Sequence, residues 1–79
     1  MQAVLIAIPG PGARTFSITN GQTVQQFVDA HAPGMIDGYD PSRYNVVVNG
    51  TQMSKSVAAT RLVASGNEIF LTRAIKGAN

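Results

Sequence analysis

The sequence predicts one small α+β domain, and three features carry this prediction. Apolar runs of strand length lie in both halves of the chain, one stretch has helical periodicity, and turn-forming dipeptides separate them. Of the 79 residues, 44% are hydrophobic and only 13% are charged, which is enough apolar material for one core and unlike a disordered segment. The absence of cysteine excludes disulfides, thiolate metal sites and a cysteine nucleophile.

A hairpin is predicted at the start of the chain. Residues 3–8 form an unbroken apolar run, which is typical of a strand covered on both faces in the middle of a sheet. The Pro-Gly-Pro-Gly sequence at 9–12 predicts a tight reversal. In residues 13–19, Phe16 and Ile18 alternate with mostly polar side chains, which indicates a partner strand with one buried face.

A helix is predicted to begin at Val24. Thr23 and Gln26 have the spacing of a capping box, which satisfies backbone donors at a helix start. The expected apolar face consists of residues at helical spacing, namely Val24, Phe27, Val28 and His31. Pro33-Gly34 is expected to stop this helix after about three turns, and an exposed loop is expected to run from there to Arg43.

Three further strands are predicted in the C-terminal half. Residues 44–48 have strand chemistry, and Asn49-Gly50 after them is the strongest hairpin signal in the chain, because both residues tolerate positive φ in a type I′ turn. Residues 51–53 are expected to return as a short strand, and residues 68–75 to form the last one. For residues 54–64, a helical turn and a short bridge segment at Leu62-Val63 remain alternatives.

The order of these elements predicts a β-grasp, ubiquitin-like fold with a mixed sheet of four to five strands and one helix packed across it. A right-handed crossover through the helix, with an opening strand too apolar for a sheet edge, places the first and last strands side by side and parallel at the centre. We expect residues 1–75 to form this single domain and residues 76–79 to form a C-terminal tail. The predicted core is Leu5, Ile6, Phe16, Phe27, Val47, Ile69 and Leu71.

Two segments of the C-terminal half also carry a family resemblance. Residues 46–50 have the sequence Val-Val-Val-Asn-Gly, and residues 59–75 run from Ala-Thr-Arg-Leu through Gly-Asn-Glu-Ile to Thr-Arg-Ala-Ile. In both, the chain resembles the bacterial sulfur-carrier proteins of thiamin and molybdopterin synthesis, which are ubiquitin-like β-grasp domains. Asn67 stands where that family usually has an aspartate, and the N-terminal half matches in topology only.

The resemblance implies a role for the C-terminal tail. Sulfur carriers and ubiquitin-like modifiers end in Gly-Gly, whose carboxylate is adenylated and then converted into a thiocarboxylate or an isopeptide bond. This sequence ends Lys76-Gly77-Ala78-Asn79, so either the tail is trimmed to Gly77 or the carrier chemistry is absent. The residues favour the second alternative, because a narrow activating channel accepts glycine and not side chains.

No catalytic constellation, metal-ligand set or cofactor motif is found in the sequence. His31 is the only histidine, and no cysteine or acid pair stands at metal spacing around it. The glycines at 10 and 12 lack the lysine and the following helix of a phosphate-binding loop. Asp37 and Asp40 offer too few oxygen ligands for a calcium loop. We therefore expect a protein that is not an enzyme and needs no cofactor.

The sequence instead favours a small protein-interaction module, with another protein as its partner. Tyr39 and Tyr44, with Met35 and Ile36 nearby, predict an exposed aromatic and apolar patch. In the alternative, Tyr44 packs into the core while Met35 and Ile36 close over the helix end. Under the carrier hypothesis the partner would be an adenylating, E1-like enzyme. The candidate partner-binding residues are Arg73, Ile75, Lys76, Gly77, Met35 and Tyr39.

Nucleic acid and membrane are not expected as partners. The net charge is +2, and the basic residues are scattered except for Arg73 and Lys76, so a basic face made of these two and Arg61 is only a third hypothesis. The apolar run at residues 3–8 is shorter than the ~20 residues that span a bilayer. It also lacks the basic flank and cleavage site of a signal peptide, so a cytoplasmic location is expected.

Overall fold

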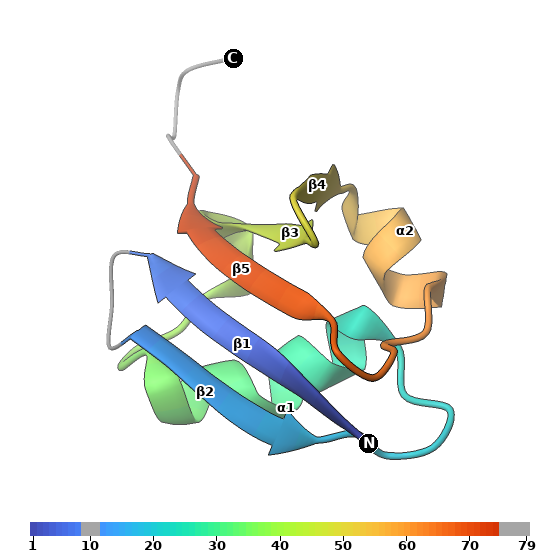
Figure 1. Ribbon diagram of the computed structural model, residues 1–79. Helices are drawn as coiled ribbons and strands as arrows, with labels where there is room; N and C mark the ends of the chain where they lie inside the picture. The colour runs from blue at the N-terminus through green and yellow to red at the C-terminus, as the bar shows by residue number, and fades with distance from the viewer. Residues whose placement is uncertain (9–11, 75–79) are drawn as a thin grey trace.

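The first and last strands pair in parallel at the middle of a five-stranded mixed sheet (Figure 1). The computed structural model describes residues 1–8 and 12–74. The strands are β1 (Gln2–Ile8), β2 (Gly12–Ser17), β3 (Tyr44–Val48), β4 (Thr51–Met53) and β5 (Glu68–Arg73), in the order β2-β1-β5-β3-β4. The helical segments are α1 (Val24–Met35), the 3-10 turn η1 (Pro41–Arg43) and α2 (Lys55–Thr60).

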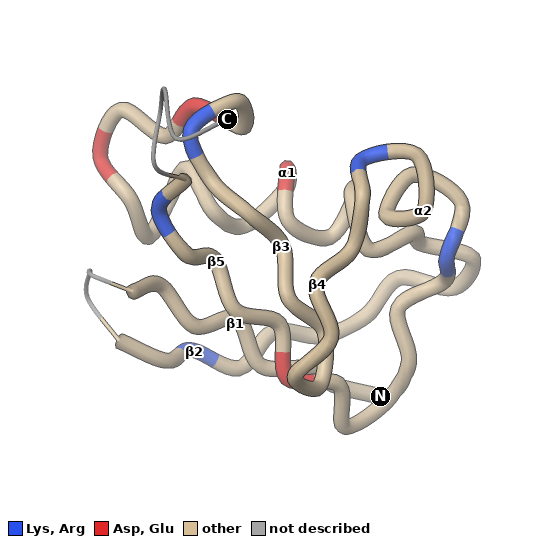
Figure 2. The backbone as a smooth tube through the Cα atoms, turned by 90° about the horizontal axis from the view of Figure 1, so that it is seen from above, with Lys and Arg blue, Asp and Glu red and all other residues tan. Residues whose placement is uncertain are grey.

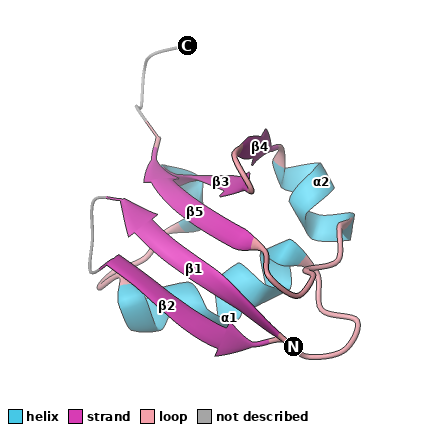
Figure 3. Ribbon diagram, in the orientation of Figure 1, coloured by secondary structure: helices cyan, strands magenta, loops and turns pink. Residues whose placement is uncertain are grey.

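The register of β1 against β5 aligns the side chains that form the core. Leu5 pairs with Ile69 and Ala7 with Leu71, while β2 and β3 flank this parallel pair in antiparallel orientation. The chain connects the two halves of the sheet through α1, which lies against one face (Figure 3). The predicted parallel pairing of the first and last strands is therefore confirmed.

The start of α1 has the predicted capping box. The Thr23 hydroxyl accepts a hydrogen bond from the Gln26 backbone N–H at 3.1 Å, and the Gln26 side chain accepts one from the Thr23 N–H at 2.9 Å. Phe27, with no exposed surface, lies at the centre of the buried helix face. That face consists of Val24, Phe27, Val28, Ala32 and Met35.

The helix does not end at Pro33, as the sequence predicted, but continues to Met35. A proline near the end removes only one helical hydrogen bond, and the ladder still closes because the Ile36 N–H donates to the Ala32 carbonyl at 2.8 Å. The extension beyond Pro33 buries Met35 in the core, which favours the longer helix. The expected loop is shortened further by η1, which Asp40 caps.

Both alternatives for residues 54–64 occur, one after the other. Ser54 caps α2 by accepting a hydrogen bond from the Val57 N–H at 3.3 Å. Beyond α2, Leu62 forms an isolated bridge with Thr23, and the Val63 N–H donates to the Gln22 carbonyl at 3.0 Å. This segment therefore holds the start of α1 in place.

The sheet has one covered face and one open face, which corrects the prediction for β1. On the covered face, Leu5, Ile69 and Leu71 are fully buried under α1. On the opposite face, Ile6 and Val47 are only half-buried and lie outside the core, contrary to the predicted core set. Within residues 1–8 and 12–74 only one long helix is present, and it can cover only one face. Four of the predicted core residues are confirmed as buried, Leu5, Phe27, Ile69 and Leu71, while Phe16 packs against them half-buried.

Substitutions on the two faces of the sheet should differ in how much they lower the free energy of unfolding. Phe27→Ala and Leu71→Ala should each lower the free energy of unfolding by about 3 to 5 kcal/mol, because they leave cavities in the core. Val47→Thr, on the open face, should cost less than about 1.5 kcal/mol, since threonine keeps the β-branched shape and its hydroxyl can reach water. Chemical denaturation measures both. An equal loss for Val47→Thr and Leu71→Ala would show that the open face is packed.

Candidate functional site

Five large apolar side chains lie on the sheet face opposite α1, and we call them the open face: Val4, Ile6, Ile8, Val47 and Phe70. Ile6 pairs with Phe70 and Phe70 with Val47, so these three form a row across β1, β5 and β3. Ile8 is exposed and the other four are half-buried by their neighbours on the sheet, yet none packs against the core. In Figure 1 this face is turned toward the viewer, and no helix crosses it.

The rim of the open face is polar and carries little charge. Thr15 is opposite Val4, Gln52 is opposite Val47, and Asn45 is opposite Thr72, next to the central row. Glu68 lies opposite Val4. Among the described residues, it is the one charged residue that the strand register places on this face. The rim therefore leaves the apolar centre accessible without surrounding it with charge.

The strand register places two basic residues on the other side of the sheet. Arg14 pairs with Leu5 and Arg73 pairs with Tyr44, so both alternate onto the side that faces α1. Figure 2 shows the Lys and Arg segments spread over the chain rather than joined in one stripe. The open face is consequently a neutral to weakly acidic surface on a chain with a net positive charge.

A second concave feature is a cleft of about 410 Å³ where β4 ends beside η1 and the start of α2. Tyr39 and Tyr44 line it with ring centroids 5.4 Å apart and planes tilted by 33°. Met53 adds apolar surface, whereas Gln52 and Lys55 add polar groups. The cleft exists because β4 has only three residues and does not extend along β3 as far as Tyr44.

The environment of Tyr39 changes the acidity of its phenol. Burial, followed by the Asp29 carboxylate and smaller contributions from Tyr44 and Asp40, raises the pKa of Tyr39 to about 12. The phenol therefore stays protonated at physiological pH, and it can act as a hydrogen-bond donor in the cleft.

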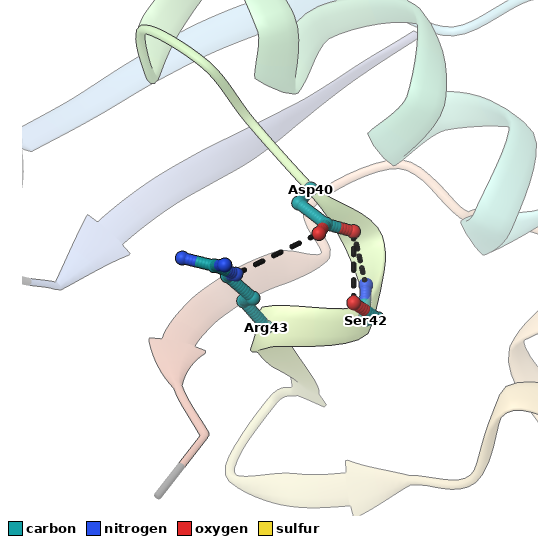
Figure 4. Close-up of polar contacts among 3 residues, drawn as sticks. All are labelled: Asp40, Ser42 and Arg43. Atoms are coloured by element: carbon teal, nitrogen blue, oxygen red, sulfur yellow. Dashed lines mark hydrogen bonds and ion pairs between the residues drawn. The ribbon is translucent and has the colours of Figure 1, made fainter. Parts of the chain in front are cut away.

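Asp40 serves the local fold, as Figure 4 shows. Its carboxylate accepts hydrogen bonds from the Ser42 N–H at 3.0 Å and from the Ser42 hydroxyl at 2.9 Å. These bonds, with a smaller contribution from the Arg43 guanidinium 3.7 Å away, lower the pKa of Asp40. The carboxylate thereby caps η1 and orients the turn between the two cleft tyrosines.

Arg73 lies beside Arg43, a neighbour that the sequence analysis did not identify. The two arginines line a hollow of about 340 Å³ with Ser42 and Ala74, and the Ala74 N–H donates to the Arg43 carbonyl at 2.8 Å. Arg61, by contrast, is the C-cap of α2. In Figure 2 the Lys and Arg segments beside α2 lie apart from those beside β3 and β5. Of the basic face proposed as the third hypothesis, Arg61 and Arg73 are therefore not brought together, and Lys76 lies outside the described residues.

The other predicted partner-binding residues differ in burial and in whether the structure describes them. Met35 is buried in the core, as in the alternative where it closes over the helix end, while Tyr39 is half-buried in the cleft. Ile75, Lys76 and Gly77 lie outside the described residues, so their roles remain predictions.

The sequence analysis missed the open face, although one signal was available. The chain shows a single long helical pattern, and one helix cannot cover both faces of a five-stranded sheet.

His31 has the packing role that was expected: its ring stacks on Phe16 with centroids 4.0 Å apart.

Among residues 1–8 and 12–74, no three His, Cys, Asp or Glu side chains are grouped so that they could hold a metal ion. No helix in the same residues is long and apolar enough to cross a membrane. Comparisons with protein-family models, curated proteins and solved structures gave no match for the chain.

The raised pKa of Tyr39 predicts a loss of stability at alkaline pH. A tyrosine in the unfolded chain ionises near pH 10, whereas Tyr39 in the folded chain ionises near 12. The contribution of Tyr39 is thus complete below about pH 10 and declines as pH rises toward about 12. NMR titration of the Tyr39 ring should give the raised midpoint, and Asp29→Asn should lower it. A midpoint near 10 in the folded protein would contradict the prediction.

Proposed function

We propose that this chain is a ubiquitin-like β-grasp domain that works as a non-catalytic protein-interaction module and docks through the open face. The observation that carries the proposal is the row of Ile6, Phe70 and Val47 across three adjacent strands, on the face that α1 does not cover. Apolar side chains gathered on one face and rimmed by polar residues are a feature of protein-interaction sites.

The composition of the open face supports docking of a protein surface. An apolar centre with a polar rim is the usual anatomy of protein interfaces, in which centre residues lose water and rim residues keep it. Phe70 provides the aromatic group that such centres favour. Burial of these side chains by a partner contributes roughly 25 cal/mol per Å² of apolar surface, before the cost of association is subtracted.

The rim defines what a suitable partner must present. Thr15, Asn45 and Gln52 offer hydrogen-bonding groups around the centre, and Glu68 adds a carboxylate at one end. A complementary partner has an apolar surface with polar groups at its edge and a basic residue opposite Glu68. Like charge at that position would disfavour the complex.

A sulfur carrier or protein modifier, activated at a trimmed Gly77 by an adenylating enzyme, is a second candidate function. The observation in its favour is that the two segments behind the family resemblance bond to each other. The Asn49 N–H donates to the Glu68 carbonyl at 2.9 Å, and the Asn49 side-chain oxygen accepts from the Glu68 N–H at 2.8 Å. Arg43 and Arg73, near the end of β5, would then contact the activating enzyme.

Docking through the open face predicts position-specific crosslinking in cells of the native host. A photoreactive amino acid in place of Val47 should capture a defined protein, whereas the same group in place of Ala30, exposed on α1, should not. Adding Phe70→Thr to the position-47 variant should reduce the captured product at least about tenfold if the residue is a central anchor. Equal capture from both positions, or no effect of Phe70→Thr, would contradict docking through this face.

The intact mass of the protein from its native source separates the two candidate functions. An interaction module should retain Ala78 and Asn79 and carry no added sulfur, because that role needs no free glycine carboxylate. A carrier should end at Gly77, with a fraction heavier by replacement of one oxygen by sulfur. We expect the mass that includes Ala78 and Asn79, and a Gly77 terminus would reverse the ranking.

A further inference from the structure

The chain contains the same reactive dipeptide twice, at Asn20-Gly21 and at Asn49-Gly50. In an Asn-Gly sequence the glycine backbone nitrogen can attack the asparagine side-chain amide, because glycine has no Cβ to obstruct the approach. Both dipeptides are exposed in turns. The intrinsic chemistry of the two sites is therefore the same, and any difference in reactivity comes from the folded structure.

Asn49 is held by hydrogen bonds that ring closure would break. Its side-chain oxygen accepts from the Glu68 N–H at 2.8 Å, and its own N–H donates to the Glu68 carbonyl at 2.9 Å. Its backbone has a φ of 50° and Gly50 one of 88°, within the turn that joins β3 to β4. To reach the Gly50 nitrogen, the side chain must first leave Glu68 while both strands stay paired.

Asn20 has no comparable restraint. The surrounding turn is closed by the Gln22 N–H, which donates to the Thr19 carbonyl at 3.0 Å, and by the Thr19 N–H, which donates to the Gln22 side chain at 3.2 Å. Both bonds join Thr19 to Gln22 and do not involve Asn20. Within the described residues the exposed Asn20 side chain itself forms no hydrogen bond, so it can turn toward the Gly21 nitrogen.

We propose that Asn20 is a site of spontaneous deamidation in the folded protein and that the bonds to Glu68 protect Asn49. The Gly21 nitrogen forms a bond to the Asn20 side-chain carbonyl carbon as the bond from that carbon to Nδ2 breaks. The proton of the Gly21 amide leaves with the departing nitrogen, which is released as ammonia. Water then opens the five-membered imide at either carbonyl and gives aspartate or isoaspartate at position 20.

The fold can accommodate the product at this position. The new carboxylate lowers the formal net charge of +2 by one, and it lies three residues before Thr23, the N-cap of α1. The first turn of α1 has no acidic residue, and a negative charge near a helix N-terminus is tolerated or favourable. We expect the modified chain to stay folded and to accumulate, because residue 20 lies in an exposed turn outside α1.

The test compares the two dipeptides within the same molecule. The full chain is incubated at mildly alkaline pH in native buffer and, in parallel, in denaturant, then digested with trypsin and mapped by mass spectrometry with isoaspartate detection. Asn20 lies in the tryptic peptide 15–43 and Asn49 in 44–55, so the sites are separated. In native buffer Asn20 should react at least about tenfold faster, because Asn49 must open locally first. In denaturant the two rates should agree within about twofold, since both segments are then unfolded.

Two variants complete the test. Asn20→Gln should suppress deamidation in peptide 15–43, read as the mass gain of one amide-to-acid change, without changing Asn49, because glutamine would require a larger ring. Asn49→Gly should keep the turn, since glycine accepts positive φ, and should leave the rate at Asn20 unchanged. Equal native rates at both dipeptides, faster reaction at Asn49, or an inert Asn20 in native buffer would each overturn the proposal.

Discussion

The parallel pairing of β1 with β5 is the constraint on which the rest of the structure depends. Parallel strands cannot be joined by a tight turn, so a long crossover connection is needed between them, and here it includes α1. That crossover places Phe27 over Leu5, Ile69 and Leu71, the largest fully buried strand side chains. The core, the position of α1 and the division of the sheet into two faces all follow from this pairing.

The division into two faces separates the side chains that stabilise the fold from those that stay accessible. Side chains under α1 lose nearly all contact with water and supply the hydrophobic stabilisation of the fold. Those on the open face, such as Ile6 and Phe70, contribute less because the described chain does not cover them. Residues on the open face can thus change while the core stays intact, which suits the interaction module that we propose.

Two asparagines link the strand ends near the start of β5. Asn67 is buried, and its side-chain oxygen accepts from the Ala64 N–H at 2.8 Å while its carbonyl accepts from the Val4 N–H at 2.9 Å. The neutral amide accepts the Ala64 bond without the cost of burying a charge, which gives a physical reason for an asparagine at this position. Asn49 bonds to Glu68 from the other side, so both edges of β5 are anchored at its start.

The sequence by itself determined the elements whose signals are local. The Thr23–Gln26 capping box, the Asn49-Gly50 turn and the alternation in β2 depend on neighbouring residues, and each predicted its element correctly. The parallel β1–β5 pair also followed, because few topologies join these elements. Only the tertiary structure decided the end of α1 beyond Pro33, the burial of Met35, and the proximity of Arg43 to Arg73. The tertiary structure also decided which face of the sheet is open. The apolar run of β1 shows no alternation in sequence, so its exposed side is set by the face on which α1 packs.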